Sequence, residues 1–287
     1  MKNILVTGGL GFIGSHTTVE LSNAGYTPII IDNLSNSNIN VLDGISKIIG
    51  TKPKFYQGNY QDEKLLDRVL TDNKIDGVIH FAAYKAVGES IDKPLDYYQN
   101  NVAGLITLLS SLLDNNVEHF VFSSSCTVYG EPDRVPITEE APIKPATSPY
   151  GATKQIDEII LKDTTLASSL KVIALRYFNP IGAHNSALIG ELPKGTPANL
   201  VPYITQAAAG LRDKLTVNGN DYPTPDGTCI RDYIHVVDLA HAHLKALEFA
   251  TKQKQSYYDV FNLGTGNGSS VLEVINNFQH VTGVNVP

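Results

Sequence analysis

Cysteine is scarce in this sequence, and long apolar runs are missing altogether. Only two cysteines occur, Cys126 and Cys229. They are too few for a disulfide framework and indicate a reducing compartment. No apolar run reaches the roughly 20 residues that a membrane-spanning helix requires, and the N-terminus lacks the apolar segment of a signal peptide. We therefore expect a cytoplasmic protein with no membrane partner.

Positive charge is also in short supply. The formal net charge is −7 at pH 7, and no block of Lys and Arg offsets it, so the composition argues against a nucleic-acid partner. The eight histidines are scattered, and His241 and His243 would face different ways on a helix, so we predict no metal site. With 287 residues, 42% of them hydrophobic and 18% charged, the chain suits one large globular domain or two closely joined ones.

The first feature that is present is a glycine-rich turn between a strand and a helix. Residues 3–7 predict a short buried strand, and residues 13–23 predict a helix. Gly8, Gly11 and Gly14 occupy the junction between them. Glycines at such a junction permit a tight turn, close backbone approach to a pyrophosphate and close packing of the helix on the strand. The free amides at the start of the helix would then hold the phosphates.

An acidic residue completes this pattern. A second apolar strand, residues 28–31, ends at Asp32. A carboxylate at this place can accept hydrogen bonds from both ribose hydroxyls of a dinucleotide, and it repels a 2′-phosphate. The sequence therefore predicts a dinucleotide site that takes NAD in preference to NADP.

Strands and helices continue to alternate along the chain. The further strands that we expect are residues 54–57, 78–81, 119–124, 171–176, 233–236 and 260–263. The helices that we expect are residues 62–70, 94–115 and 201–209, one that opens at Tyr150, one that ends near Ala250 and one that begins at Ser270. This order predicts an α/β fold, a Rossmann-type doubly wound parallel sheet with ligands at the carboxyl ends of its strands.

The later part of the chain is less regular. Residues 179–232 are rich in Asn, Gly and Pro but keep apolar anchors, which is typical of a substrate-binding layer above the sheet. We expect residues 1–178 to form an NAD-binding domain. Residues 179–287 would form a smaller mixed substrate region whose later βα segments return to the first domain.

Tyr150 and Lys154 are the strongest catalytic candidates. Four residues apart on a helix, they share one face, and an ammonium near a phenol favours the phenolate. Spacing alone decides nothing, because Tyr60 and Lys64 form a second such pair. Position separates the two pairs, since residues 123–125, all serines, lie at the carboxyl end of a strand near which Tyr150 opens its helix. A serine hydroxyl there would complete a proton relay.

Other polar residues in favourable places have plainer alternatives. Lys85 follows a strand and could meet a cofactor phosphate, or it could be an ordinary solvated lysine. Arg231 offers a two-pronged donor for a pyrophosphate. Asn179 and Asn199 are candidate ligand contacts, although surface asparagines are usually turn residues.

Six segments from end to end of the chain are similar to segments of known proteins. They are residues 6–16, 81–90, 122–130, 148–154, 175–184 and 227–240. These segments resemble the UDP-glucose 4-epimerase family, which belongs to the extended short-chain dehydrogenase/reductases. The glycine-rich and Tyr/Lys segments are shared by the whole superfamily, whereas the segments 81–90, 175–184 and 227–240 are much closer to the epimerases.

The resemblance implies an NAD-dependent isomerase of carbohydrate and galactose metabolism that interconverts UDP-galactose and UDP-glucose. Tyr150 as phenolate would take the proton of the sugar 4-hydroxyl, Ser125 would hold that oxygen, and Lys154 would bind the nicotinamide ribose and lower the pKa of the phenol. Tightly bound NAD would oxidise the sugar at C4 and, after the 4-keto sugar has turned, reduce it from the opposite face.

The resemblance also implies two sets of binding residues. The cofactor set is Gly8, Gly11, Phe12, Ile13, Gly14, Asp32, Asn33, Asn59, Phe81, Ala82, Lys85, Asn100, Ser123, Tyr150, Lys154 and Tyr177. The UDP-sugar set is Ser125, Tyr150, Asn179, Asn199, Leu200 and Arg231. A homodimer built on the helices near residues 94–115 and 149–167 is expected from the family.

The sequence departs from the family pattern at several positions. Asn59 replaces the usual Asp at the adenine, Asn218 replaces a Phe near the uridine, Leu192 replaces an Asp and Cys126 replaces an Ala. The Asn218 change puts selectivity for the base in doubt. Family members continue beyond the position of Pro287, so we expect the C-terminal part of the family fold, with some UDP-sugar contacts, to be absent from this sequence.

Two other functions stay open at this point. The first is a related sugar-nucleotide dehydratase or dehydrogenase, which is disfavoured because Cys126 and Thr127 stand where a dehydratase usually has an acidic pair. The second is a catalytically silent NAD-binding regulator. It is disfavoured because such proteins commonly lose the Tyr or the Lys, and both Tyr150 and Lys154 are present.

Overall fold

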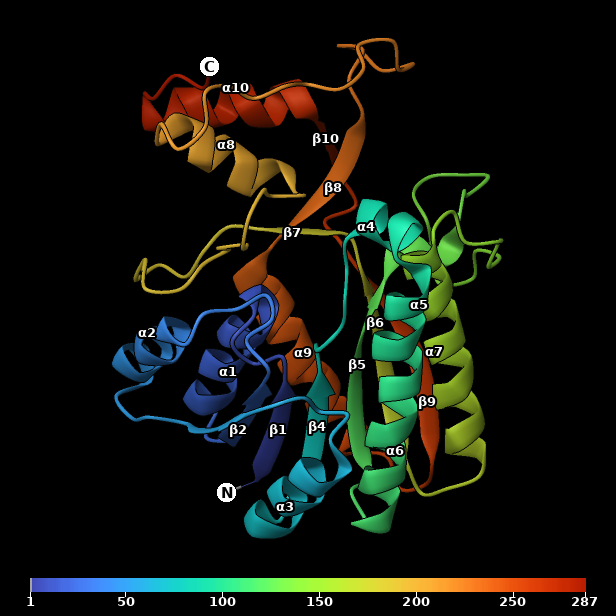
Figure 1. Ribbon diagram of the computed structural model, residues 1–287. Coiled ribbons are helices and arrows are strands. Elements are labelled where there is room, and N and C mark those ends of the chain that lie inside the picture. The colour runs from blue at the N-terminus through green and yellow to red at the C-terminus, as the bar shows by residue number, and fades with distance from the viewer. Residues whose placement is uncertain (1) are drawn as a thin grey trace.

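The computed structural model describes residues 2–287 and is built on a seven-stranded parallel sheet (Figure 1). The strand order is β3-β2-β1-β4-β5-β6-β9. The strands are β1 (Asn3–Thr7), β2 (Thr27–Asp32), β3 (Lys54–Gln57), β4 (Gly77–His80), β5 (His119–Ser125), β6 (Lys171–Tyr177) and β9 (Tyr257–Leu263). The order reverses beside β1, which creates the crevice where such sheets bind ligands. The predicted doubly wound Rossmann-type sheet is confirmed.

Helices cover both faces of the sheet. The helices are α1 (Phe12–Asn23), α2 (Asn40–Ile49), α3 (Glu63–Asn73), α4 (Val87–Asp92), α5 (Pro94–Tyr97), α6 (Gly104–Asp114), α7 (Pro149–Leu166), α8 (Leu200–Ala208), α9 (Val236–Ala250) and α10 (Val271–Thr282). Side chains alternate along β1, so that Ile4 packs with Leu247 of α9 on one face and Leu5 packs with Leu105 of α6 on the other. Two covered faces explain why the central strands are apolar throughout.

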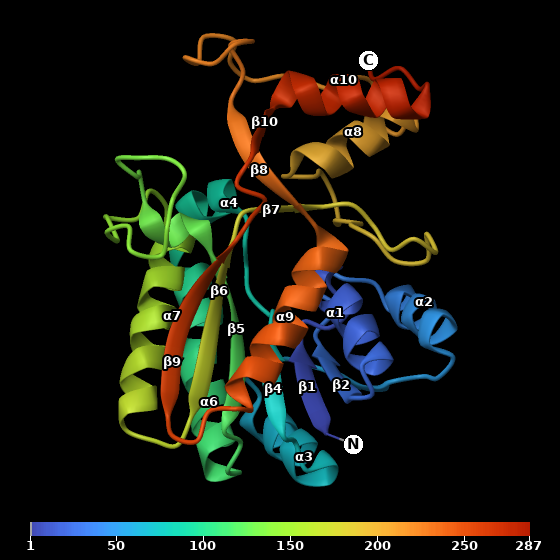
Figure 2. The same ribbon diagram turned by 180° about the vertical axis from the view of Figure 1, so that it is seen from behind.

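A second layer lies beyond the carboxyl ends of the large sheet. It contains a three-stranded sheet of order β10-β8-β7, in which β7 is Asn179–Ile181, β8 is Ile230–His235 and β10 is Gly268–Ser270. Figures 1 and 2 show this small sheet above the main sheet, with α8 and α10 farther out. The chain leaves the large sheet after β6, forms β7, α8 and β8 of this layer, returns through α9 to β9, and completes the layer with β10 and α10.

Several elements differ from the sequence predictions. The expected helix 94–115 is a continuous helical run that consists of α5, a π-helix over Tyr98–Ala103 and α6. The expected strand 233–236 is β8 and pairs with β7 and β10 instead of the parallel sheet. The short elements α2, α4, β7 and β10 were not predicted. Within residues 2–287, no helix is both long and apolar enough to cross a membrane.

Candidate active site

A cavity lies at the carboxyl ends of the central strands, where residues 190–193 also line it. Every residue that we assigned to the cofactor, apart from Asn59, lines this cavity. Of the residues assigned to the UDP-sugar, only Tyr150 lines it. The cavity also includes residues 35–38 and 190–193, together with Tyr60 and Tyr84, none of which the sequence assigned to the site.

The glycine-rich turn brings the backbone close to neighbouring chain. Gly8 has φ +68°, and a Cβ added there would lie 2.9 Å from the backbone nitrogen of Ala82. A Cβ at Gly14 would lie 2.3 Å from the carbonyl oxygen of Gly8. Gly11 caps α1 without a side-chain hydrogen bond, so no side chain occupies the N-terminal amides that line the cavity. This end of α1 is therefore available to an anionic group.

Asp32 is held in a fixed orientation at the end of β2. Its Oδ2 accepts a hydrogen bond from the Leu10 amide at 3.0 Å, and its Oδ1 accepts from the Leu34 amide at 2.9 Å and the Ser37 hydroxyl at 2.7 Å. A carboxylate has about four acceptor positions and three are occupied here, so about one remains for a further donor. Asp32 lines the cavity beside Asn33, and the remaining position suits a hydroxyl group.

The serines at the end of β5 have different partners, because side chains alternate along a strand. The hydroxyls of Ser123 and Tyr177 lie 2.7 Å apart. Ser124 Oγ donates to Glu158 Oε1 at 2.6 Å, on the other side of the strand. Ser125 Oγ accepts from the amide of Thr127 at 3.2 Å. Ser123 is the serine that lines the cavity, and Ser125 lies two residues farther along the strand.

Helix α7 brings the Tyr/Lys pair to this edge. Ser148 caps the helix by accepting from the Gly151 amide at 3.1 Å, and Pro149 takes the first helical position, where no amide donor is needed. Tyr150 and Lys154 are therefore in the first turns of α7 and both line the cavity. Lys154 Nζ donates to the carbonyl of Ser123 at 2.9 Å and lies 4.4 Å from the centre of the Phe122 ring.

The sequence predicted that Lys154 lowers the pKa of Tyr150, but the protein groups around Tyr150 raise this pKa on balance. Burial raises the pKa of Tyr150 well above its ordinary value, and the neighbouring Tyr177 raises it further, while hydrogen bonding with Ser125 acts in the opposite direction. Lys154 directs its ammonium to the Ser123 carbonyl, which is why it does not lower the pKa of this phenol. Burial likewise lowers the pKa of Lys154.

Glu191 connects the predicted cofactor and substrate residues. Its carboxylate lies 3.5 Å from Lys85 Nζ and accepts from Asn199 Nδ2 at 2.7 Å. The Lys85 side chain is half exposed, and that of Glu191 is 10% exposed. Sequence reasoning did not assign Glu191 to the site, because its role depends on two segments that meet only in the folded chain.

The other predicted substrate residues lie around the second layer, outside the cavity. Asn179 on β7 donates to the carbonyl of Asp232 at 3.0 Å. Leu200 is the first residue of α8, and Arg231 is exposed on β8. Asn59, the one predicted cofactor residue that does not line the cavity, accepts a hydrogen bond from the Gln61 amide through its carboxamide oxygen at 3.1 Å. The fold therefore gathers the predicted cofactor residues closely and leaves the predicted substrate residues more dispersed.

The competing pair, Tyr60 and Lys64, is not a second site. Tyr60 is buried, and its hydroxyl donates to the backbone carbonyl of Asn100, whereas Lys64 is exposed. The Tyr60 ring is packed in the core and also lines the cavity. The signal that was overlooked is its position just after β3, at the same edge of the sheet as Asp32.

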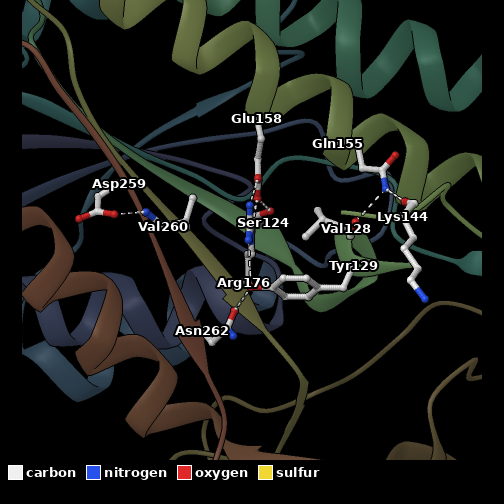
Figure 3. Close-up of polar contacts among 10 residues, drawn as sticks. All are labelled: Ser124, Val128, Tyr129, Lys144, Gln155, Glu158, Arg176, Asp259, Val260 and Asn262. Atoms are coloured by element: carbon white, nitrogen blue, oxygen red, sulfur yellow. Dashed lines mark hydrogen bonds and ion pairs between the residues drawn. The ribbon is translucent and has the colours of Figure 1, made fainter. Parts of the chain in front are cut away.

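A buried polar network fixes α7 against the sheet behind the Tyr/Lys pair (Figure 3). Arg176 Nε donates to Glu158 Oε1 at 2.9 Å, and Arg176 Nη1 donates to the Tyr129 hydroxyl at 2.9 Å. The Tyr129 hydroxyl in turn donates to Asn262 Oδ1 at 2.7 Å. These contacts join α7 to β6 and β9, so they hold the helix that carries Tyr150.

Among residues 2–287, no group of His, Cys, Asp and Glu side chains has an arrangement that could hold a metal ion.

Comparison with known proteins extends over almost the whole chain. The model of the NAD dependent epimerase/dehydratase family matches residues 4–264. A UDP-glucose 4-epimerase from Yersinia enterocolitica is 54% identical over 286 residues, which are 99% of this chain and 84% of that protein. One from Bacillus subtilis (strain 168) is 52% identical over 285 residues, which are 99% of this chain and 83% of that protein.

Solved structures agree with these matches. The UDP-glucose 4-epimerase from Bifidobacterium longum, in complex with NAD+ and UDP, has a TM-score of 0.96 and 49% identity, and the match covers 100% of this chain and 85% of that one. The enzyme from Stenotrophomonas maltophila, with NAD and formylated UDP-arabinopyranose, has a TM-score of 0.96 and 50% identity at the same coverage. The resemblance seen in the sequence is confirmed. Because the match runs from β1 to the residue after β9, this chain belongs to the NAD dependent epimerase/dehydratase family.

Proposed function

We propose that this chain is a UDP-glucose 4-epimerase, an isomerase that interconverts UDP-galactose and UDP-glucose with tightly bound NAD. The relatives that share about half of its residues over nearly its whole length carry this activity in their names. The observation that carries the proposal is the cavity in which Tyr150 and Lys154 lie beside the glycine-rich turn and Asp32. One cavity thus joins an acid–base pair to a dinucleotide site.

The residues around the cavity fit NAD. The close approach of Gly8 to Ala82 and the uncapped start of α1 suit a pyrophosphate. The fixed carboxylate of Asp32 suits an unphosphorylated ribose. Lys154, with its ammonium near the Ser123 carbonyl, is placed for the nicotinamide ribose. When bound, NAD supplies a reversible oxidant for C4 of the sugar.

The chain's own residues handle the proton and the orientation. Tyr150 takes the proton from the sugar 4-hydroxyl while C4 is oxidised, and it returns that proton after C4 is reduced from the other face. Ser125 holds the 4-oxygen. Lys154 lines the same cavity and directs its ammonium to the Ser123 carbonyl. Hydrogen removed from C4 and O4 is fully restored, so the reaction has no net redox change.

The second layer supplies the grip on the nucleotide sugar. We propose that Arg231 on β8 binds the pyrophosphate and that Asn179, Asn199 and Leu200 contact the rest of the nucleotide sugar. This is supported by the position of β7, β8 and the start of α8 in one layer. We propose the division into an NAD-binding domain, residues 1–178, and a UDP-sugar region, residues 179–287. It is supported by the passage of the chain from β6 to the small sheet at this point, and α9 and β9 belong structurally to the first domain.

The direct test is an assay with UDP-galactose and no added cofactor, followed by detection of UDP-glucose. Turnover is expected, and the Tyr150→Phe variant should lose at least about 100-fold in kcat because its general base is gone. Tyr222→Phe, at an exposed tyrosine, is the matched control and should keep full activity. No turnover, even after NAD is added, would refute the proposed activity and favour the silent NAD-binding alternative.

We also propose a homodimer that forms through α5, α6 and α7. Figures 1 and 2 show these helices side by side along one side of the molecule. They expose large apolar side chains, among them Leu95 at 79%, Ile106 at 49% and Ile159 at 60%. Exposed apolar surface on adjacent helices is typical of an interface between two copies of a chain.

The dimer is tested by light scattering coupled to size-exclusion chromatography. Ile159→Glu should shift the mass from dimer to monomer, because it places a charge within the apolar surface. Val135→Glu, at an even more exposed residue outside these helices, should leave the mass unchanged. An unaltered dimer in the Ile159→Glu variant would place the interface elsewhere.

The free thiols of Cys126 and Cys229 support our further proposal of a cytoplasmic location.

A further inference from the structure

Asp157 is a buried acid that the proposed reaction does not use. It lies three residues after Lys154 on α7, so the two side chains are neighbours on the helix surface. Asp157 is only 1% exposed. Its Oδ1 atom is buried and has no hydrogen-bond donor among residues 2–287. A buried carboxylate without a donor is costly, so its presence beside a catalytic pair calls for a reason.

Glu158, the next residue along α7, does have hydrogen-bond donors for its carboxylate. Glu158 is bound by both Nε and Nη2 of Arg176 and by the hydroxyl of Ser124 (Figure 3). Arg176 is therefore committed to Glu158. Lys154 is the remaining buried cation on this face of α7, where it is 3% exposed and forms no ion pair within 4.0 Å among the described residues.

The groups that face the two side chains are few. Tyr150 and Glu158, on the same helix, and Tyr60, from the segment after β3, each interact electrostatically with Asp157. His80 of β4 faces Lys154. His80 is held neutral because burial lowers its pKa to about 3, and both tyrosines are neutral because burial raises their pKa values. Once Glu158 is paired with Arg176, the charges left in this region are those of Lys154 and Asp157.

We propose that Asp157 is a positioning residue that acts through Lys154, as the buried counter-charge that keeps the ammonium of this lysine protonated beside Tyr150. This inference rests on the proposed epimerase function and deepens it. Asp157 does not touch the reacting atoms. It maintains the positive charge of Lys154, which lines the cavity and donates to the Ser123 carbonyl.

The directions of the pKa shifts agree with this geometry. Burial lowers the pKa of Lys154, and Asp157 is the largest influence that raises it again. Burial also raises the pKa of Asp157 to about 7, against the lowering effect of Lys154. Asp157 is therefore a carboxylate above about pH 7 and takes a proton below it, so its support of Lys154 is confined to neutral and alkaline pH.

The first test compares the pH profile of kcat for the holoenzyme and for Asp157→Asn, which has nearly the same shape without the charge. The alkaline limb should move to lower pH by about half a unit or more, because Lys154 loses its counter-charge. Below about pH 7 the two profiles should converge. Asp157→Glu should restore the original limb, and Asp163→Asn, at an exposed acid of the same helix, should not move it. A uniform loss of kcat with unmoved limbs would overturn the proposal.

The second test does not depend on activity, so it separates failure of this inference from failure of the proposed function. Thermal midpoints are measured across pH for Asp157→Asn, Lys154→Met and the double variant. Above about pH 7 the two substitutions should be non-additive, because each removes one member of the same charge pair. The non-additivity should disappear below that pH, where Asp157 is protonated. Additive midpoints at every pH would overturn the inference even in an active enzyme.

Discussion

A single buried histidine shows how burial sets the acid stability of this molecule. His243 on α9 is fully buried and packs against Phe81, with 4.6 Å between the ring centres. Its Nδ1 donates to the carbonyl of Leu239 at 2.8 Å, and its Nε2 has no partner among the described residues. Burial lowers the pKa of His243 to about 4. The folded protein therefore requires the neutral imidazole.

The pH dependence of stability follows from this shift. The contribution of His243 is fully present above its unfolded pKa of about 6.5 and is lost as the pH falls toward about 4. Relative to His243→Asn, which keeps a donor for Leu239, the native protein should lose roughly 3 kcal/mol more of its unfolding free energy over this range. Urea unfolding at several pH values checks this. His280→Asn, at an exposed histidine, should track the native protein, and equal pH slopes for His243→Asn would contradict the argument.

The Glu158–Arg176 pair gives a second prediction at this scale. Glu158→Gln removes the negative charge that is paired with the buried Arg176 guanidinium. Because the buried positive charge is then uncompensated, we expect a loss of about 3 kcal/mol or more in unfolding free energy. Replacing both residues, as Glu158→Leu with Arg176→Met, should recover part of that loss, because no buried charge then remains unpaired. Urea unfolding of the single and double variants measures both effects. A double variant that is less stable than Glu158→Gln would show that the network itself is stabilising.

The close packing of α1 on the turn before it leads to a prediction for an element. In Gly14→Ala the new methyl group would meet the carbonyl of Gly8 at 2.3 Å, so α1 must shift away from the cavity. The purified variant should retain much less NAD, as measured by absorbance after denaturation. Gly88→Ala in α4 is the matched control, since a Cβ there meets no atom within 4 Å. It should retain NAD and gain up to about 1 kcal/mol of stability from helix propensity.

Long, strongly patterned elements could be predicted from the sequence, whereas short ones that depend on tertiary contacts could not. β1, α1 and β2 were placed correctly, because their apolar runs and glycines carry local information. No helix was predicted where α2 lies. It includes Gly44, where a Cβ would meet the carbonyl of Leu188 at 2.5 Å, so its packing depends on a segment far along the chain. The π-helix over Tyr98–Ala103 was not predicted, because a segment of six residues is too short to establish a period of its own within a longer helix.

The same division applies to the site. Asp32 and the Tyr/Lys pair could be placed at one edge, because the carboxyl ends of parallel strands meet there. Glu191 could not be found, since its partners Lys85 and Asn199 come from distant segments. The pKa of Tyr150 was also misjudged, because helix spacing gives a neighbour but not the direction in which the ammonium of Lys154 points.

At the scale of the whole molecule, Glu191 links the main sheet to the second layer. Through Lys85 it contacts the segment after β4, and through Asn199 it contacts the start of α8. Glu191→Ala should therefore raise the KM for UDP-galactose by about tenfold, while NAD content changes little, because Lys85 and Asn199 lose their common partner. Steady-state kinetics and cofactor content measure the two effects. Loss of NAD with an unchanged KM would instead assign Glu191 to the cofactor.

The position of β9 in the sheet also has a consequence for the way the chain is made in the cell. β9 pairs with β6 along its full length, from Lys171 with Tyr257 to Tyr177 with Leu263. Between them the ribosome must synthesise β7, α8, β8 and α9. Throughout that interval β6 is an open edge, which is the kind of surface that pairs with other chains. Nascent chains are therefore prone to aggregation, and in need of chaperones, until Leu263 at the end of β9 has left the ribosomal tunnel.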